Sequence, residues 1–149
     1  MASRIYLDTS VYHRPFDDQA QPRIWLETLA VSIIFQMVES SAIELVTSTV
    51  LTYEVSRNPD ENQRNWVQRV SASAAIHQDL TEELRRRAKE LESRGLKALD
   101  ALHVASAETA KVDYFVTCDD RLIRRYRTTP QRSLIVCGPT EFVENFSGE

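Results

Sequence analysis

Four acidic residues occupy places in the chain where carboxylates can do chemistry. Asp8 and Asp119 each follow a short apolar run, and Glu54 and Asp100 lie early in segments with helical patterns. Asp100 adjoins a stripe of apolar residues, where an aspartate is rarely found without a partner or a task. Taken singly, an aspartate after a strand is more often a turn or cap residue. The functional interpretation therefore depends on whether the fold brings the four carboxylates together.

The elements that must position these acids follow from apolar patterning and capping residues. The predicted strands are residues 5–7, 43–47, 74–76, 114–117 and 133–137. The predicted helices are residues 23–39, 49–56, 60–71, a segment between Thr81 and Gly95, 98–111, 121–126 and 139–146, while residues 13–22 read as a loop.

Strands that alternate with helices, each strand a continuous apolar run, predict an α/β fold. We expect one domain over residues 1–149, a three-layer sandwich whose central parallel sheet has four to five strands with helices on both faces. In such sheets ligands bind beyond the carboxyl ends of the strands, where the strand order reverses. Asp8 and Asp119 come directly after strands, so this architecture offers one rim where the acids can converge.

Carboxylates gathered at one point repel each other and raise each other's pKa unless a cation is present. Ligation by oxygen alone, without a cysteine or histidine partner, suits a hard divalent ion such as Mg²⁺ or Mn²⁺. Such an ion can lower the pKa of a bound water and hold a phosphodiester oxygen.

Composition limits the classes of function. The 149-residue chain has a net charge of -4, so its overall charge does not indicate a nucleic-acid binder. This argument against nucleic-acid binding is weaker if several of the acids are neutralised by a bound cation. Cys118 and Cys137 form neither a metal-ligand spacing nor a disulfide framework and suit the cytoplasm. The longest apolar stretch, residues 24–38, is shorter than the roughly 20 residues that span a bilayer, so we expect no membrane segment.

Four short motifs in order resemble one family: IYLDTS at residues 5–10, SxxLTYE at 48–54, LDALHVA at 99–105 and VTxDxxL at 116–122. Each motif alone is weak, but together they cover nearly the whole chain. The chain resembles a PIN domain, specifically the VapC-type ribonuclease toxins of prokaryotic toxin–antitoxin pairs. The resemblance implies a Mg²⁺- or Mn²⁺-dependent endoribonuclease that cuts RNA and is inhibited by a cognate antitoxin protein.

The resemblance also assigns roles by position. It places the catalytic, metal-binding acids at Asp8, Glu54, Asp100 and Asp119. Small hydroxyl residues beside the acids fall on Ser10 and Thr117, which we expect to help position the substrate. Arg121 is close in sequence to the acids and is a candidate for contacting substrate phosphate. The family and the apolar helix at 23–39, which we expect to be buried on more than one side, suggest a homodimer.

Several alternatives remain open. Asp120 adjoins Asp119 and could be the fourth acid, although the spacing to Leu122 favours Asp119. His103 lies one helical turn after Asp100, and we interpret it as a packed core histidine. A non-catalytic PIN scaffold that binds RNA or a protein partner is the main competing function. A phosphatase of the haloacid-dehalogenase type would need a second aspartate where Ser10 stands.

Overall fold

A parallel sheet forms the centre of the protein and places the carboxyl ends of its strands at one edge. The computed structural model describes residues 2–146 and has the strands β1 (Arg4–Leu7), β2 (Glu44–Ser48), β3 (Ile76–Gln78), β4 (Tyr114–Val116) and β5 (Ile135–Cys137). Their order is β3-β2-β1-β4-β5, and every neighbouring pair is parallel. The chain adds β2 and β3 on one side of β1 and then crosses to add β4 and β5 on the other side. The strand order therefore reverses between β1 and β4, which is where such sheets bind ligands.

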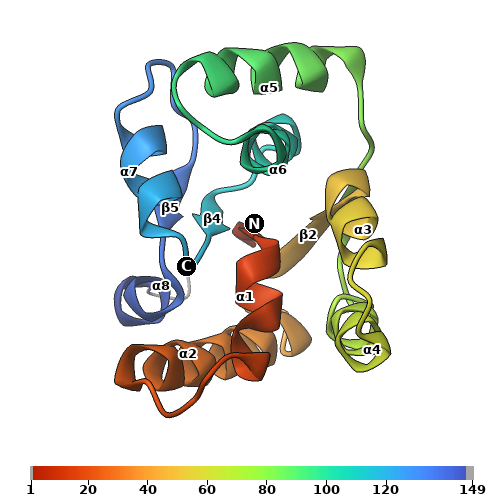
Figure 1. Ribbon diagram of the computed structural model, residues 1–149, viewed down its shortest axis with the longest axis vertical. Helices are drawn as coiled ribbons and strands as arrows, with labels where there is room; N and C mark the ends of the chain where they lie inside the picture. Colours follow the sequence, from red (N-terminus) through yellow and green to blue (C-terminus); the bar gives the residue numbers. More distant parts are fainter. Residues whose placement is uncertain (1, 147–149) are drawn as a thin grey trace.

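Helices cover both faces of this sheet (Figure 1). They are α1 (Thr9–His13), α2 (Pro22–Glu39), α3 (Thr49–Ser56), α4 (Glu61–Val70), α5 (Glu82–Ser93), α6 (Ala98–Thr109), α7 (Asp120–Arg127) and α8 (Pro139–Asn145), with a 3-10 turn η1 (Arg14–Phe16). Along β1, Tyr6 packs with α5, α6 and α7, whereas Ile5 and Leu7 pack with the other five helices. This alternation is the period of two of a β-strand, and it confirms the predicted three-layer α/β sandwich.

The predicted helix ends agree with the capping geometry. Ser48 Oγ accepts a hydrogen bond from the backbone N–H of Leu51 at 3.0 Å and begins α3. Thr81 caps α5 in the same way. Losing such a cap typically costs about 1 kcal/mol of stability. Gly95 follows the last residue of α5 with a φ of +105°, a left-handed conformation that favours glycine.

Two predictions near the sheet were wrong. Residues 9–13 form α1 where no helix was predicted, because a five-residue helix is too short to show periodicity and Asp8 caps it. The edge strand β3 is Ile76–Gln78 rather than 74–76. Its register pairs Val46 with Ile76, while the backbone N–H of Ala74 is bonded in a turn to the Ser71 carbonyl.

Helix α2 is buried on one side only, which corrects the expectation that it is buried on several. Its sheet-facing side includes Ala30, Val31, Ile34 and Val38, all nearly inaccessible to solvent. The opposite side exposes four large apolar side chains, between 42% and 54% accessible: Trp25, Leu26, Leu29 and Ile33. Although α2 is the longest helix, neither it nor any other helix within residues 2–146 has the length and apolarity needed to cross a membrane.

Candidate metal and nuclease site

Asp8 is the centre of the site, because it lies at the end of the central strand and is almost fully buried. Its backbone N–H continues the sheet ladder by donating to the Val116 carbonyl at 3.0 Å. Its Oδ1 accepts from the backbone N–H of Thr9 at 2.8 Å. Its Oδ2 accepts from the hydroxyls of Ser10 at 2.9 Å and Thr117 at 2.7 Å. These donors fix the carboxylate. Oδ1, which accepts one hydrogen bond, keeps a lone pair for a cation, whereas Oδ2 accepts two.

Ser10 and Thr117 connect this carboxylate to the turn that carries Asp119. Ser10 Oγ accepts from the backbone N–H of Cys118 at 3.1 Å, and Thr117 Oγ1 accepts from the backbone N–H of Asp119 at 3.1 Å. The two hydroxyls lie 3.4 Å apart. Both residues therefore lie beside the acids as the sequence suggested, and in this structure their contacts orient Asp8.

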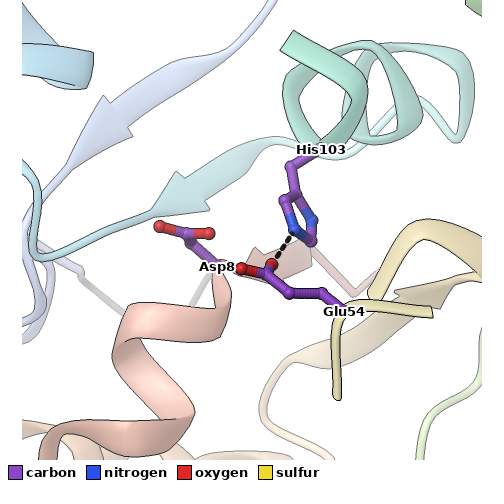
Figure 2. Close-up of side chains that lie close together, drawn as sticks. All are labelled: Asp8, Glu54 and His103. Carbon is purple, nitrogen blue, oxygen red and sulfur yellow. Dashed lines mark hydrogen bonds and ion pairs between the residues drawn. The ribbon is translucent and has the colours of Figure 1, made fainter. Parts of the chain in front are cut away.

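Glu54 lies in the second turn of α3, where the cap at Ser48 sets the start of the helix. Its Oε1 accepts from Thr9 Oγ1 at 2.5 Å and lies 2.7 Å from Nε2 of His103 (Figure 2). Burial alone would raise the pKa of Glu54, but the hydrogen bonds from His103 and Thr9 hold it below its usual value. Glu54 is therefore kept ionised next to Asp8.

His103 is the residue whose contacts sequence reasoning missed. It is fully buried, as predicted for a core histidine, yet one nitrogen contacts Glu54 and the other lies 2.7 Å from the hydroxyl of Tyr6. Burial would lower the pKa of His103, but the hydrogen bond to Glu54 and the nearby charge of Asp8 raise it. Its position one turn after Asp100 was the available signal, because that spacing puts both side chains on one side of α6.

Asp100 lies in the first turn of α6 and is half-buried. Burial and the negative charges of Asp8 and Asp119 raise the pKa of Asp100 to about 6, while His103 and Lys97 act in the opposite direction. The carboxyl of Asp100 therefore lies in a partly buried position near two other acids.

Asp119 and Asp120 face different partners. Asp119 caps α7 by accepting from the backbone N–H groups of Arg121 and Leu122, and it lines a small cavity with Asp100 and Arg121. Asp120 instead receives two hydrogen bonds from the guanidinium of Arg23, at 2.7 and 2.8 Å. The geometry therefore favours Asp119 as the acid that belongs to the site.

The four acids are not equally close. One ligand atom each from Asp8, Glu54 and His103 lies within 4.8 Å of the other two, the one such group among residues 2–146. The charges of Asp8 and Asp119 both act on Asp100, and Asp100 and Asp119 line one cavity. Both nitrogens of His103 already have partners, so the donors best placed for a cation are carboxylate oxygens. Oxygen donors with excess negative charge fit Mg²⁺ or Mn²⁺.

Comparison with known proteins agrees with this arrangement. The family model of the PIN domain matches residues 5–128. No curated protein matches the sequence closely. Among solved structures, VapBC2 from Rickettsia felis, bound to a DNA fragment from its promoter, is 15% identical with a TM-score of 0.55, covering 89% of this chain and 98% of that one. PAE2754 from Pyrobaculum aerophilum is 20% identical with a TM-score of 0.53, covering 96% and 93%.

These two likenesses show the fold alone, whereas the family match extends over most of the chain and includes all four acids, Asp8, Glu54, Asp100 and Asp119. The chain belongs to the PIN domain family.

Proposed function

We propose that this protein is a Mg²⁺- or Mn²⁺-dependent endoribonuclease that hydrolyses RNA phosphodiester bonds. PIN domains are generally nucleases, and the intact acidic set gives no reason to treat this chain as inactive. The observation that carries the proposal is the gathering of carboxylates from separate segments: Asp8 and Glu54 offer ligand atoms within 4.8 Å of each other, and Asp100 and Asp119 line one cavity. Burial and the charges of Asp8 and Asp119 raise the pKa of Asp100, in agreement with this crowding. The intact set of four acids disfavours a PIN scaffold that only binds RNA or a protein partner.

In this proposal Asp8, Glu54, Asp100 and Asp119 hold the ion, with Asp8 and Asp100 as the core ligands. When bound, the ion supplies a water of lowered pKa and a positive charge opposite the phosphate. Attack on phosphorus requires the nucleophile to lie in line with the departing 3′ oxygen, so the substrate must be held in one orientation.

The substrate contacts in this proposal come from the rim of the same site. Arg121, at the start of α7, lines the cavity shared by Asp100 and Asp119 and is the candidate phosphate contact. Ser10 and Thr117 act on the substrate indirectly, because their hydroxyl contacts orient Asp8.

Cleavage of structured and unstructured RNAs with Mg²⁺ or Mn²⁺, and then with EDTA, tests the proposal. We expect cleavage by the parent that is lost with EDTA and in Asp8→Asn and Asp100→Asn. Asp79→Asn is the matched control: it removes an exposed carboxylate that is not one of the four site acids, so the variant should keep its activity. Cleavage that survives chelation would exclude the metal mechanism, and RNA binding without cleavage would favour the scaffold.

We further propose that the chain is the toxin of a toxin–antitoxin pair and forms a homodimer. The antitoxin is suggested by the family resemblance and by the likeness to VapBC2. The homodimer is supported by the exposed apolar side of α2, because monomeric proteins rarely leave such a stripe open. Sedimentation of Leu29→Glu tests this contact: we expect a dimeric parent and a monomeric variant, and an unchanged variant contradicts it.

The cytoplasm is the proposed location. Cys118 and Cys137 are free and buried, and burial raises the pKa of each thiol to about 12. Free thiols are typical of a reducing compartment. Cell fractionation would test this.

A further inference from the structure

We propose that His103 is a positioning residue that holds Glu54 in the orientation needed to bind the divalent cation, an inference that rests on the proposed function. His103 is fully buried on α6, yet it reaches an acid on α3 that lies 49 residues earlier in the chain. Neither ring nitrogen is spare, because Nε2 lies 2.7 Å from Glu54 Oε1 and Nδ1 lies 2.7 Å from Tyr6 Oη. A buried imidazole with both nitrogens engaged acts through its partners.

The donors and acceptors around His103 form a directed chain. A carboxylate only accepts, so His103 Nε2 donates to Glu54, and in the neutral ring Nδ1 accepts from the Tyr6 hydroxyl. Tyr6 Oη lies 2.6 Å from Ser48 Oγ, which itself accepts from the backbone N–H of Leu51. The chain thus starts at the cap of α3, crosses three side chains, and returns to Glu54 on the same helix.

Both hydrogen bonds that reach the carboxylate of Glu54 from residues 2–146 end on the same oxygen. Thr9 Oγ1 donates to Oε1 at 2.5 Å, and His103 contacts Oε1 at 2.7 Å. Two donors on one oxygen restrain the rotation of the carboxylate. The other oxygen, Oε2, then points toward Asp8, where it can bind a cation (Figure 2). Partners of this kind, one step removed from a metal, commonly set the affinity of the site.

The partner of His103 Nδ1, Tyr6, lies in the middle of the sheet. Tyr6 lies on the central strand β1, stacked on Phe115 with ring centroids 5.4 Å apart and planes 7° apart. The His103 ring meets Tyr6 edge-on, with centroids 5.8 Å apart. The imidazole is therefore fixed by the core. Direct coordination through Nε2 would require it to give up Glu54.

The role of His103 is tested by titrating the metal-free protein with Mn²⁺ in a calorimeter, which measures the Mn²⁺ affinity. His103→Leu keeps the volume and removes the donor, whereas His103→Gln places an N–H near the original Nε2. We expect the leucine variant to lose about 10- to 100-fold in Mn²⁺ affinity and in kcat, and the glutamine variant to recover most of both. Tyr6→Phe, which removes the partner of Nδ1, should lose several-fold.

The outcomes separate this inference from the function on which it rests. A parent that does not bind Mn²⁺ overturns the proposed function and this inference together. A parent that binds, with unchanged affinity in His103→Leu and Tyr6→Phe, overturns only the role of His103. If circular dichroism shows that the leucine variant does not fold, the other two variants decide the question. Weaker Mn²⁺ binding in Tyr6→Phe with near-parental binding in His103→Gln supports the role of His103, and parental binding in Tyr6→Phe overturns it.

Electron spin-echo spectroscopy of bound Mn²⁺ separates a positioning residue from a ligand. We expect no coupling to a coordinated imidazole nitrogen. Coupling that disappears in His103→Gln would make His103 a direct ligand and overturn the proposal.

Discussion

Two charged clusters lie close together in this protein and differ in how their negative charge is balanced. At the first, burial and the charges of Asp8 and Asp119 raise the pKa of Asp100 to about 6. At the second, buried Glu27 lies 2.9 Å from the guanidinium of Arg14, and Arg23 pairs with Asp120, holding the pKa of Asp120 below its usual value.

The adjacent residues Asp119 and Asp120 belong to different clusters. The second cluster supplies its own cations, arginines from η1 and α2, and joins α2 to α7. At the first, His103 and Lys97 oppose the pKa rise of Asp100, but burial and the neighbouring acids outweigh them. We infer that the second cluster is neutralised within the protein, whereas the first leaves negative charge for the proposed cation.

The largest expected difference is in activity. Asp100→Asn removes a proposed core ligand and should lower RNA cleavage about 1000-fold, because a metal-assisted site supplies several kcal/mol to the transition state. Glu27→Gln changes only the self-neutralised cluster, so its cleavage per folded molecule should equal that of the parent. Rates measured at saturating Mn²⁺, normalised to folded protein, check both. Equal losses in the two variants would remove the distinction between the clusters.

Stability should respond in the opposite way. Arg14→Met takes away the nearest partner of buried Glu27 and should cost about 3 kcal/mol of unfolding free energy, because an unpaired buried charge is expensive. Arg85→Met, on the exposed side of α5, is the control and should change stability by less than about 0.5 kcal/mol. Urea denaturation measures both. A change in Arg14→Met as small as that of the control would show that Arg23 alone balances Glu27.

The smallest expected effect is the change with pH in the stability of the metal-free protein. The folded pKa of Asp100 lies above its ordinary value of 3.8, so the unfolded chain loses this proton first as pH rises. Stability from this group is therefore highest below pH 4, falls between about pH 4 and 6, and stays lower above that range. Since Asp100 is half exposed, the fall is about 1 kcal/mol.

Glu54 and His103 also titrate, so the Asp100 effect must be read as a difference. Asp100→Asn should gain stability relative to the parent as pH rises from 4 to 7. Thermal melts in EDTA at each pH measure it. A difference that does not change with pH would show that Asp100 is not crowded by Asp8 and Asp119.

The positions of the acids could be predicted from the sequence, because each depends on local signals. Asp8 follows an apolar strand, and Glu54 lies in the second turn of the helix that Ser48 caps. The parallel arrangement then places the strand ends at one edge. The same reasoning identified the three layers, since continuous apolar runs predict a sheet covered on both faces.

What the sequence could not provide depends on contacts between distant residues. Arg23 lies 97 residues before Asp120, and its pairing is what separates Asp120 from Asp119. The contacts of His103 with Glu54 and Tyr6 span 49 and 97 residues. The prediction that α2 is buried on more than one side was wrong for a related reason. Apolar residues around a helix do not tell which side packs on the sheet and which remains exposed.

The most direct measurement is anomalous diffraction from crystals of the parent grown with Mn²⁺. The account predicts one strong peak within ligand distance of the carboxylates of Asp8 and Asp100, with His103 still hydrogen-bonded to Glu54. A peak at another group of acids, or none at saturating Mn²⁺, would contradict it.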